Sequence, residues 1–384
     1  MDKRVIESKL PGVGTTIFTR MSALASESGA LNLSQGFPDF DAPELLRESM
    51  ARHVMAGHNQ YAPMAGVMRL REQLAAQLAL HRNIRSDPER EITVVPGATE
   101  GIFCSVMACV RPGDEVIVFD PCYDSYQPAV ELAGGRAVHV PLTAGSFALD
   151  RDRLEAALSR RTRLIMINSP HNPTGSTLTK EDMLYLEELV ERRKLLVLSD
   201  EVYEHLVFDN RKHHSALQFP GLRARSFVLF SFGKTFSVTG WKTGYCVAPA
   251  ALSAEMRKVH QFVSFVAVTP VQLAMADFLE AEPDYPATLA DFYQRKRDLF
   301  CAALDSSRFK LAPSSGTYFQ LLDYSAICKD LDTDLCKQWT RQYGIASIPI
   351  SVFYEQPPQQ HFLRFCFAKS DPVLTAAAER LCEI

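Results

Sequence analysis

The chain has 384 residues, of which 41 are Lys or Arg and 45 are Asp or Glu, so its formal net charge is −4. This near-neutral balance lacks the overall basic character of a nucleic-acid-binding protein, and no run of about 18 apolar residues indicates a membrane-spanning helix. With 47% hydrophobic residues the composition is that of an ordinary globular protein, and the length allows two or three domains of about 150 residues.

Nine cysteines are scattered through apolar segments. Their odd number and the absence of a Cys-x-x-Cys pair argue against a disulfide framework and against a zinc site. The first ten residues, MDKRVIESKL, contain no apolar stretch typical of a signal peptide. These features predict reduced, buried thiols in a cytoplasmic protein that holds no metal ion.

From about residue 90, short apolar runs alternate with longer helical patterns. The predicted strands cover 92–95, 115–119, 136–140, 164–168, 195–199, 227–230 and 245–247, and the clearest helices cover 99–110, 126–133 and 183–192. Strands that alternate with helices predict an α/β fold, with a mostly parallel sheet covered by helices on both faces.

The pattern changes after about residue 250. Two long helical stretches, 251–280 and 284–305, are followed by the predicted strands 309–312, 318–322 and 362–367 and by a helix over 372–382. We interpret this region as a second, smaller α+β domain that the N-terminal segment joins. The predicted division is therefore a small domain built from residues 1–45 and 281–384, and a large domain of residues 46–280.

Ligands of an open α/β sheet bind at the carboxyl ends of its strands, and two loops at these ends are candidate binding segments. After strand 92–95, the segment Pro96–Gly101 places small residues at a helix start, where free backbone N–H groups attract an anion. The alternative is a tight turn that only opens a buried helix. After strand 164–168, the loop Ser169–Gly175 projects Asn172, a neutral hydrogen-bond donor, although a purely structural turn explains it equally well.

Asp200 follows the predicted strand 195–199 directly. A carboxylate at the end of an apolar strand is costly unless a cation meets it. A cationic ring nitrogen, a metal ion or an arginine would each serve, and a structural salt bridge remains the alternative at this point.

Lys234 follows the predicted strand 227–230 and is surrounded in sequence by Phe232, Phe236 and Trp241. Removal from water favours the neutral amine of such a lysine, which is the form that attacks carbonyl groups and makes Schiff bases. Lys242 lies eight residues further on and offers a second cation for a phosphate group.

Taken together, an anion site, a loop asparagine, a strand-end aspartate and a strand-end lysine match the needs of pyridoxal phosphate. The separations of these residues resemble those of the class I/II aminotransferases, which are fold type I pyridoxal-phosphate enzymes. The resemblance runs from Leu31 to Lys369 and is closest to the branch of bacterial methionine aminotransferases and kynurenine/glutamine transaminases. The segments that carry it are SQGFPDF, NQYAPMAG, NSPHNPTG, SDEVYEH, SFGKTFSVTGWKTGY and LRFCFAK.

This resemblance implies a role for each matching residue. Lys234 resembles the lysine that bonds to the cofactor and then moves the substrate's Cα proton. Asp200 resembles the partner of the pyridinium nitrogen, Asn172 and Tyr203 resemble the pair that hydrogen-bonds O3′, and Tyr123 resembles the ring stacked on the cofactor. Lys234, Asp200 and Tyr203 are the implied catalytic set.

The resemblance also implies a phosphate site and a dimer. The residues that would surround the phosphate are Gly97, Ala98, Thr99, Ser231 and Lys242. Many aminotransferases carry an arginine at the last position, and the lysine found here cannot make a two-point clamp. Tyr61 resembles the tyrosine that reaches the phosphate of the neighbouring subunit, which implies a homodimer with composite sites.

Substrate binding is implied to rest on Arg364, which resembles the arginine that pairs with the substrate's α-carboxylate through two hydrogen bonds. An interdomain salt bridge is the alternative role. Gly36 and Asn172 would complete the carboxylate site, and Phe37, Ile17 and Phe18 would form an apolar wall. Such a pocket suits methionine and aromatic or other apolar L-amino acids better than aspartate.

The resulting expectation is an aminotransferase that moves the α-amino group of methionine and related amino acids to a 2-oxo acid by a ping-pong mechanism. The alternatives are a cysteine-conjugate or kynurenine-type transaminase with carbon–sulfur β-lyase activity, and a non-catalytic ligand sensor. Three further features are set aside: Gly12-x-Gly14 opens no βαβ unit, His213-His214 is expected in a surface loop, and Cys104 with Cys109 is expected in the core.

Overall fold

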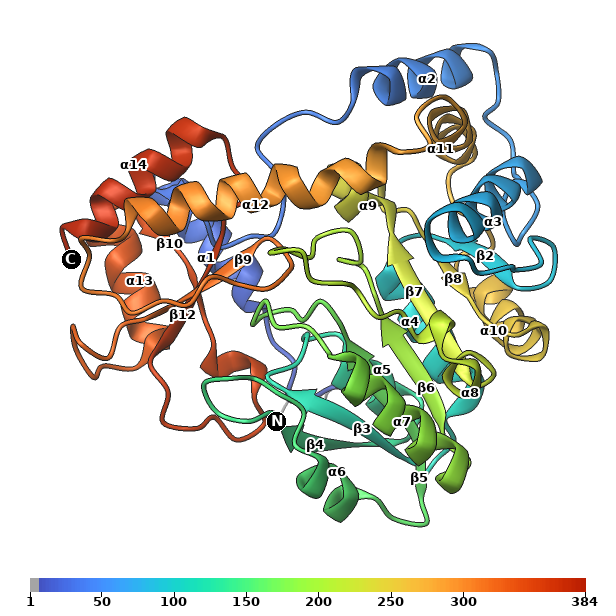
Figure 1. Cartoon of the computed structure of the whole chain (residues 1–384), viewed down its shortest axis with the longest axis horizontal. Helices are drawn as coiled ribbons and strands as arrows, with labels where there is room; N and C mark the ends of the chain where they lie inside the picture. The colour runs from blue at the N-terminus through green and yellow to red at the C-terminus, as the bar shows by residue number, and fades with distance from the viewer. Residues whose placement is uncertain (1–6) are drawn as a thin grey trace.

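A central seven-stranded sheet organises the computed structural model, which describes residues 7–384 (Figure 1). In spatial order its strands are β2 (Ile92–Val95), β8 (Gly244–Val247), β7 (Ser226–Ser231), β6 (Leu196–Asp200), β5 (Thr162–Asn168), β3 (Glu115–Asp120) and β4 (Arg136–Pro141). Strand β8 runs antiparallel to both of its neighbours, whereas the other pairs are parallel. The predicted mostly parallel α/β sheet is confirmed, with strand ends that differ by one or two residues.

Both faces of this sheet are apolar, as the continuous hydrophobic strands require. Successive residues point to opposite faces, so Val94 and Ile165 join one buried cluster while Val95 and Leu164 join the other. The helices over the first cluster are α2 (Glu44–Met55), α3 (Met68–Arg82), α6 (Arg151–Ala157), α7 (Lys180–Arg193), α8 (Pro220–Arg223) and α11 (Thr269–Ala281). Those over the second are α4 (Ala98–Cys109), α5 (Tyr126–Leu132) and α10 (Ala250–Val263).

The two ends of the chain pack together into a second layer (Figure 1). Strand β1 (Leu31–Asn32) pairs in parallel with β10 (Ile345–Ala346), and β11 (Ile348–Pro349), β12 (Phe362–Cys366) and β9 (Phe319–Asp323) form an antiparallel sheet. The helices here are α1 (Ile17–Glu27), α12 (Tyr285–Ala303), α13 (Asp332–Gln342) and α14 (Asp371–Cys382). The exact domain limits at residues 45 and 280 stay a prediction.

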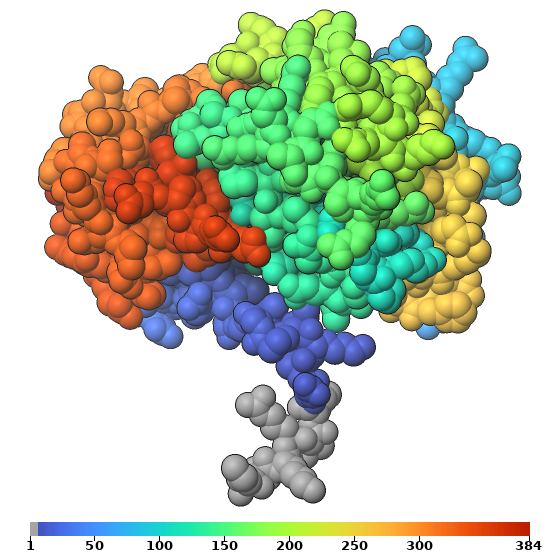
Figure 2. Space-filling model, turned by 90° about the horizontal axis from the view of Figure 1, so that it is seen from below, coloured from blue at the N-terminus to red at the C-terminus, as the bar shows by residue number. Residues whose placement is uncertain are grey.

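The N-terminal segment lies across the junction between the two parts of the molecule. Figure 2 shows its described residues beneath the boundary of the C-terminal and central regions, and the ring of Phe18 lies 5.8 Å from that of Phe353.

None of the helices in the described chain is long and apolar enough to cross a membrane. The prediction about a signal peptide concerns in part residues 1–6, which lie outside the described residues.

Two predicted elements are corrected. The stretch 251–280 forms two helices, α10 and α11, because the chain turns at Phe265, whose φ is +68°, and restarts at Pro270 in the first turn of α11. Residues 309–312 form no strand: Lys310 makes a single bridge to Asp323. Pro313 directly follows this segment, has no N–H to continue the ladder and restricts the residue before it.

His213 is also placed differently from the prediction. Its side chain is 6% exposed, and its Nε2 lies within hydrogen-bond distance, 2.8 Å, of Glu201 Oε2, so this side chain is packed against the protein and does not extend freely from a surface loop. Cys104 and Cys109 are buried in the core, as predicted. The remaining short helical turns are α9 (Phe232–Thr235), η1 (Ala216–Gln218), η2 (Thr239–Trp241) and η3 (Ser351–Phe353).

Candidate active site

A cavity of about 410 Å³ lies at the carboxyl ends of β2, β5, β6 and β7. Strand β8 runs the other way, so the residues that precede it, including Lys242, reach the same edge of the sheet. Of the predicted site residues, those that line this cavity are Phe18, Gly36, Phe37, Gly97, Ala98, Thr99, Tyr123, Asn172, Asp200, Tyr203, Ser231, Lys234, Lys242 and Arg364. Positions far apart in the sequence thus face one space.

The start of α4 forms a cradle of backbone groups. Gly97 precedes the helix with φ +82°, a conformation that favours glycine. A Cβ on Gly244 would clash with Phe230 O and would lie 3.2 Å from Ala98 N, so the neighbouring strand approaches the helix start closely. A Cβ on Gly97 would lie 3.4 Å from Lys242 Nζ. A helix N-terminus with an ammonium group beside it is suited to a phosphate.

Hydrogen bonds hold the Asn172 loop against β5 and β6. Asn168 Oδ1 accepts from Asn172 N at 2.8 Å, and Asn168 Nδ2 donates to Asp200 O at 2.8 Å. Asn172 Oδ1 accepts from Arg364 at 2.7 Å, while its amide nitrogen bonds to no residue of the described chain. That N–H₂ group remains available as a donor to a ligand in the cavity.

Asp200 is almost completely buried at the end of β6. Its Oδ2 accepts a 2.6 Å hydrogen bond from the Tyr126 hydroxyl, and its Oδ1 accepts from Val202 N at 3.3 Å. Burial raises the pKa of Asp200 to about 6, although the Tyr126 and Val202 hydrogen bonds and nearby Lys234 oppose the rise. A cation brought next to Asp200 would favour its ionised form.

This raised pKa makes folding stability depend on pH in the cofactor-free protein. Between pH 4 and 6 folded Asp200 holds its proton, whereas the unfolded aspartate, with a pKa of about 3.9, has lost it. The free energy of unfolding therefore falls as pH rises, by up to about 3 kcal/mol for this one group. Urea unfolding of the Asp200→Asn variant should lack this part of the decline between pH 4.5 and 7. Equal slopes for variant and wild type would contradict the assignment.

Lys234 lies on the short helix α9, which begins where β7 ends. Burial, with Arg364 and Lys242 nearby, lowers the pKa of Lys234 to about 8, against the opposing effects of the Cys366 thiol and Asp200. Its Nζ donates to the Tyr318 hydroxyl oxygen at 2.8 Å and to Gly36 O at 3.2 Å. A neutral amine is therefore accessible near physiological pH, as nucleophilic chemistry requires.

Arg364 crosses from β12 into the cavity and is 1% exposed. It donates to Asn172 Oδ1 at 2.7 Å and to Ser34 O at 2.8 Å, and its guanidinium carbon lies 3.9 Å from the centre of the Phe319 ring. Its Nε is buried without a partner among the described residues. A buried cationic group with an unused N–H is an incomplete arrangement that a carboxylate would complete.

Two predicted site residues do not line the cavity. Ile17 belongs to the buried core and lines a neighbouring cavity of about 460 Å³. Adjacent residues at the start of α1 point about 100° apart, so only Phe18 faces the first cavity. Tyr61 is 82% exposed and packs edge-on against Phe265, so it serves no site within its own chain.

Several lining residues were not foreseen. Asn168 ends a strand, so the rule that led to Asp200 also applies to it. Phe319 carries no comparable signal, because its segment comes to the cavity from the second layer, and the same holds for Tyr318, which does not line the cavity but contacts Lys234. The additional lining residues are Gln35, Ile102, Asn168, Val202, Gly233, Thr239, Gly240, Thr243 and Phe319.

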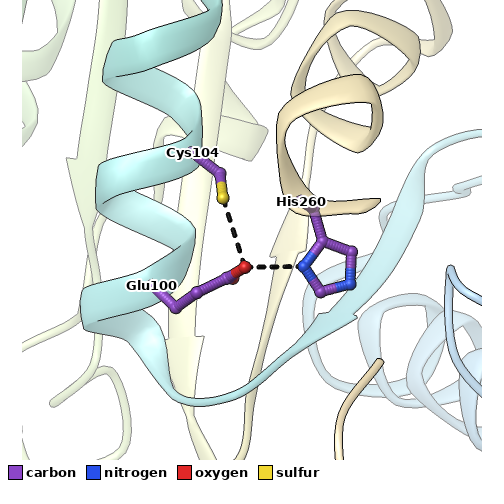
Figure 3. Close-up of side chains that lie close together, drawn as sticks. All are labelled: Glu100, Cys104 and His260. Carbon is purple, nitrogen blue, oxygen red and sulfur yellow. Dashed lines mark hydrogen bonds and ion pairs between the residues drawn. The ribbon is translucent and has the colours of Figure 1, made fainter. Parts of the chain in front are cut away.

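Glu100, in the first turn of α4, ties this helix to α10 (Figure 3). Its Oε1 accepts from His260 Nδ1 at 2.7 Å, Ser264 Oγ at 2.9 Å and Cys104 Sγ at 3.2 Å. Glu100, Cys104 and His260 form one of two groups in the described chain whose residue types could hold a metal ion. Asp120, Cys122 and His139 form the other. Three hydrogen bonds already occupy Glu100 Oε1, the oxygen that the residues of the first group share, so we assign this group a structural role, and the absence of a metal stays a prediction.

The comparisons with known proteins identify the family. Residues 28–381 match the model of the class I and II aminotransferases, and the chain belongs to this family. It is 49% identical to methionine aminotransferase of Escherichia coli, over 98% of each chain. A solved E. coli structure with a methionine aminotransferase function superimposes with a TM-score of 0.97 and 49% identity, over 99% of this chain and 100% of that one.

Two other relatives have different named activities. A probable N-succinyldiaminopimelate aminotransferase of Mycobacterium tuberculosis is 40% identical, over 97% of each chain. A kynurenine–oxoglutarate transaminase of Dictyostelium discoideum is 33% identical, over 97% of this chain and 94% of its own. The protein is therefore an aminotransferase.

Proposed function

We propose that this aminotransferase uses pyridoxal phosphate to move the α-amino group of methionine, and of related apolar or aromatic L-amino acids, to a 2-oxo acid. The observation that carries the proposal is one cavity that joins a helix-start phosphate cradle, a buried carboxylate and a buried arginine with an unused N–H. The 49% identity to a methionine aminotransferase supports methionine as the donor.

The residues present fit the cofactor. Gly97, Ala98, Thr99, Ser231 and Lys242 would hold its phosphate. The carboxyl group of Asp200, whose pKa burial raises to about 6, gains a cationic partner if a protonated ring nitrogen lies beside it. Bound pyridoxal phosphate supplies an aldehyde that bonds to amines and a ring that accepts electrons from the substrate's Cα.

The protein's own residues position the reactants and move the proton. Lys234 Nζ would take the substrate's Cα proton and later return it, since the pKa of this amine lies at about 8. Asp200 would keep a proton on the cofactor's ring nitrogen, and Asn172 and Tyr203 would hydrogen-bond its O3′. Tyr123 would pack against the ring. Arg364 and Gly36 would hold the α-carboxylate so that the Cα–H bond lies near the lysine.

The wall of the cavity supports a preference for apolar side chains. Phe18, Phe37, Ile102 and Phe319 all line it. A methionine or aromatic side chain would bury apolar surface against these side chains, whereas a second carboxylate would lose its hydration there. The substrate preference is therefore proposed as methionine and aromatic amino acids over aspartate.

A half-reaction tests the function. L-methionine added to the cofactor-loaded enzyme without an acceptor should convert bound pyridoxal phosphate to pyridoxamine phosphate and release one equivalent of the methionine 2-oxo acid per site. The measurements are the cofactor's absorbance change and product mass spectrometry, with L-aspartate as the comparison substrate. Bound methionine with an unchanged cofactor spectrum would contradict the proposal.

Kynurenine-type transamination with carbon–sulfur β-lyase activity is the second candidate, since a kynurenine transaminase is 33% identical. A cysteine conjugate would separate the two candidates. Pyruvate, ammonia and a thiol released without any added 2-oxo acid would indicate the lyase, whereas dependence on an acceptor would favour transamination.

A homodimer and a cytoplasmic location complete the proposal. Tyr61 and Phe262 are 82% and 85% exposed, and Val263, Phe265 and Val268, which are close to Phe262 in sequence, are also exposed. Exposed apolar side chains of this kind commonly mark an interface, and a second copy would let Tyr61 reach its neighbour's phosphate. Free thiols at all nine cysteines suit a reducing compartment.

A further inference from the structure

Tyr318 contacts the reactive lysine, although no motif singled it out. It directly precedes β9 and is completely buried. Its hydroxyl donates to Gly36 O at 2.5 Å, while its oxygen accepts from Lys234 Nζ at 2.8 Å. Nζ also donates to Gly36 O at 3.2 Å, so amine, phenol and carbonyl form a closed triangle.

The donor and acceptor roles in this triangle determine the orientation of the Lys234 amine. A phenol has one hydrogen, and Tyr318 gives it to Gly36 O, so towards Lys234 its oxygen can only accept. A neutral amine has two N–H bonds and one lone pair. Tyr318 and Gly36 O take the two N–H bonds, which leaves the lone pair as the remaining position on nitrogen.

Tyr318 itself is not suited to be the base. Burial, with nearby Tyr203 and Cys366, raises the pKa of its phenol well above the usual value. The phenol therefore stays protonated and cannot take the substrate's proton. The short approach to Gly36 also depends on a glycine there, because a Cβ would meet Phe319 at 2.7 Å and Tyr318 at 3.1 Å. The phenol is therefore a fixed acceptor in a tightly packed place.

We propose that Tyr318 is a positioning residue that holds the Lys234 amine whenever it is not bonded to the cofactor, with its lone pair free to take the substrate's Cα proton. The inference rests on the proposed function, in which Lys234 is the proton carrier. The hydroxyl restricts rotation about the long lysine side chain, so proton transfer starts from an oriented base instead of from an ensemble.

The first test uses the cofactor-free protein and therefore does not depend on turnover. Trace labelling with acetic anhydride at a series of pH values, read by mass spectrometry, gives the midpoint at which Lys234 becomes reactive. A hydrogen bond to Tyr318 stabilises the ammonium more than the amine. Tyr318→Phe should lower the midpoint by about half to one pH unit.

Tyr324→Phe is the matched control. Tyr324 is also buried, and its hydroxyl also donates to a backbone carbonyl, Asp330 O at 2.9 Å, but that group lies outside the cavity. The other groups that act on the amine, namely Arg364, Lys242, Asp200 and Cys366, are unchanged in both variants. An unshifted midpoint in Tyr318→Phe, or an equal shift in Tyr324→Phe, would overturn the proposal.

The loaded enzyme gives an independent readout. In Tyr318→Phe, kcat for methionine should fall about 10- to 100-fold while KM changes little, and the isotope effect with Cα-deuterated methionine should increase. A loss in KM alone would overturn the positioning role. If the wild type fails to transaminate methionine but the labelling midpoint shifts, the proposed substrate is wrong and the contact between Tyr318 and Lys234 stands.

Discussion

Replacing Lys234 by alanine is expected to lower the rate of methionine transamination by at least about 10⁴-fold. In the proposed mechanism the variant loses the amine that would bond to the cofactor and also the group that would carry the Cα proton. The other lysine that lines the cavity, Lys242, lies beside Gly97 at the start of α4, and we expect no rescue from it. Stopped-flow absorbance of the half-reaction measures the effect.

The control for this variant is Lys337→Ala, which removes a half-exposed lysine on α13. It should retain wild-type turnover and thermal stability. Mass spectrometry after borohydride treatment should find the cofactor attached to Lys234 in this control and unattached in Lys234→Ala. A folded Lys234→Ala protein with normal turnover would show that the assigned chemistry is wrong.

Arg364→Ala is expected to reduce kcat/KM for methionine by about 10²- to 10⁴-fold, because two charge-assisted hydrogen bonds of about 1.5–3 kcal/mol each are lost. Arg364→Lys should recover little of this loss, since an ammonium cannot replace a planar fork. The wild type should discriminate strongly against 3-(methylthio)propylamine, which lacks the carboxylate. Steady-state kinetics with both compounds should show that the variants have lost most of that discrimination.

Arg297→Lys supplies the matched control. Arg297 is also a buried arginine and makes a two-point pair with Asp209, at 2.7 and 2.6 Å, on α12 away from the cavity. Its replacement should lower stability without changing the ratio of the two substrates. If Arg364→Lys lowers only the melting temperature and leaves kcat/KM intact, Arg364 is a structural residue.

Much of the site could be predicted from sequence because ligands bind at the carboxyl ends of parallel strands, and those ends can be recognised from local sequence properties. Asp200 and Lys234 each follow an apolar run, and the buried end of a parallel strand leaves such residues at a common edge of the sheet. Lys242 was more difficult, since its place at that edge depends on β8 running antiparallel. Its spacing from Lys234 and the family resemblance both suggest a phosphate role for it, and its position beside Gly97 supports that role.

Other parts of the site depended on packing between distant segments. Ile17 and Phe18 are equally apolar, and only the way α1 rests on the second layer decides which one lines the cavity. Tyr318 reaches Lys234 because β9 comes against the Gly36 segment, a contact across 282 positions of sequence. The break between α10 and α11 likewise follows from a turn at Phe265 that the helical periodicity did not reveal.

The sequence by itself determined the α/β class, the identity of the strand-end residues and the family resemblance, because hydrophobic periodicity and short motifs are written locally in the chain. The tertiary structure alone decided the closed triangle of Lys234, Tyr318 and Gly36, the unused N–H of Arg364 and the raised pKa of Asp200. The physical reason is that hydrogen-bond completeness and desolvation depend on everything that surrounds a group, and those neighbours come from distant parts of the sequence.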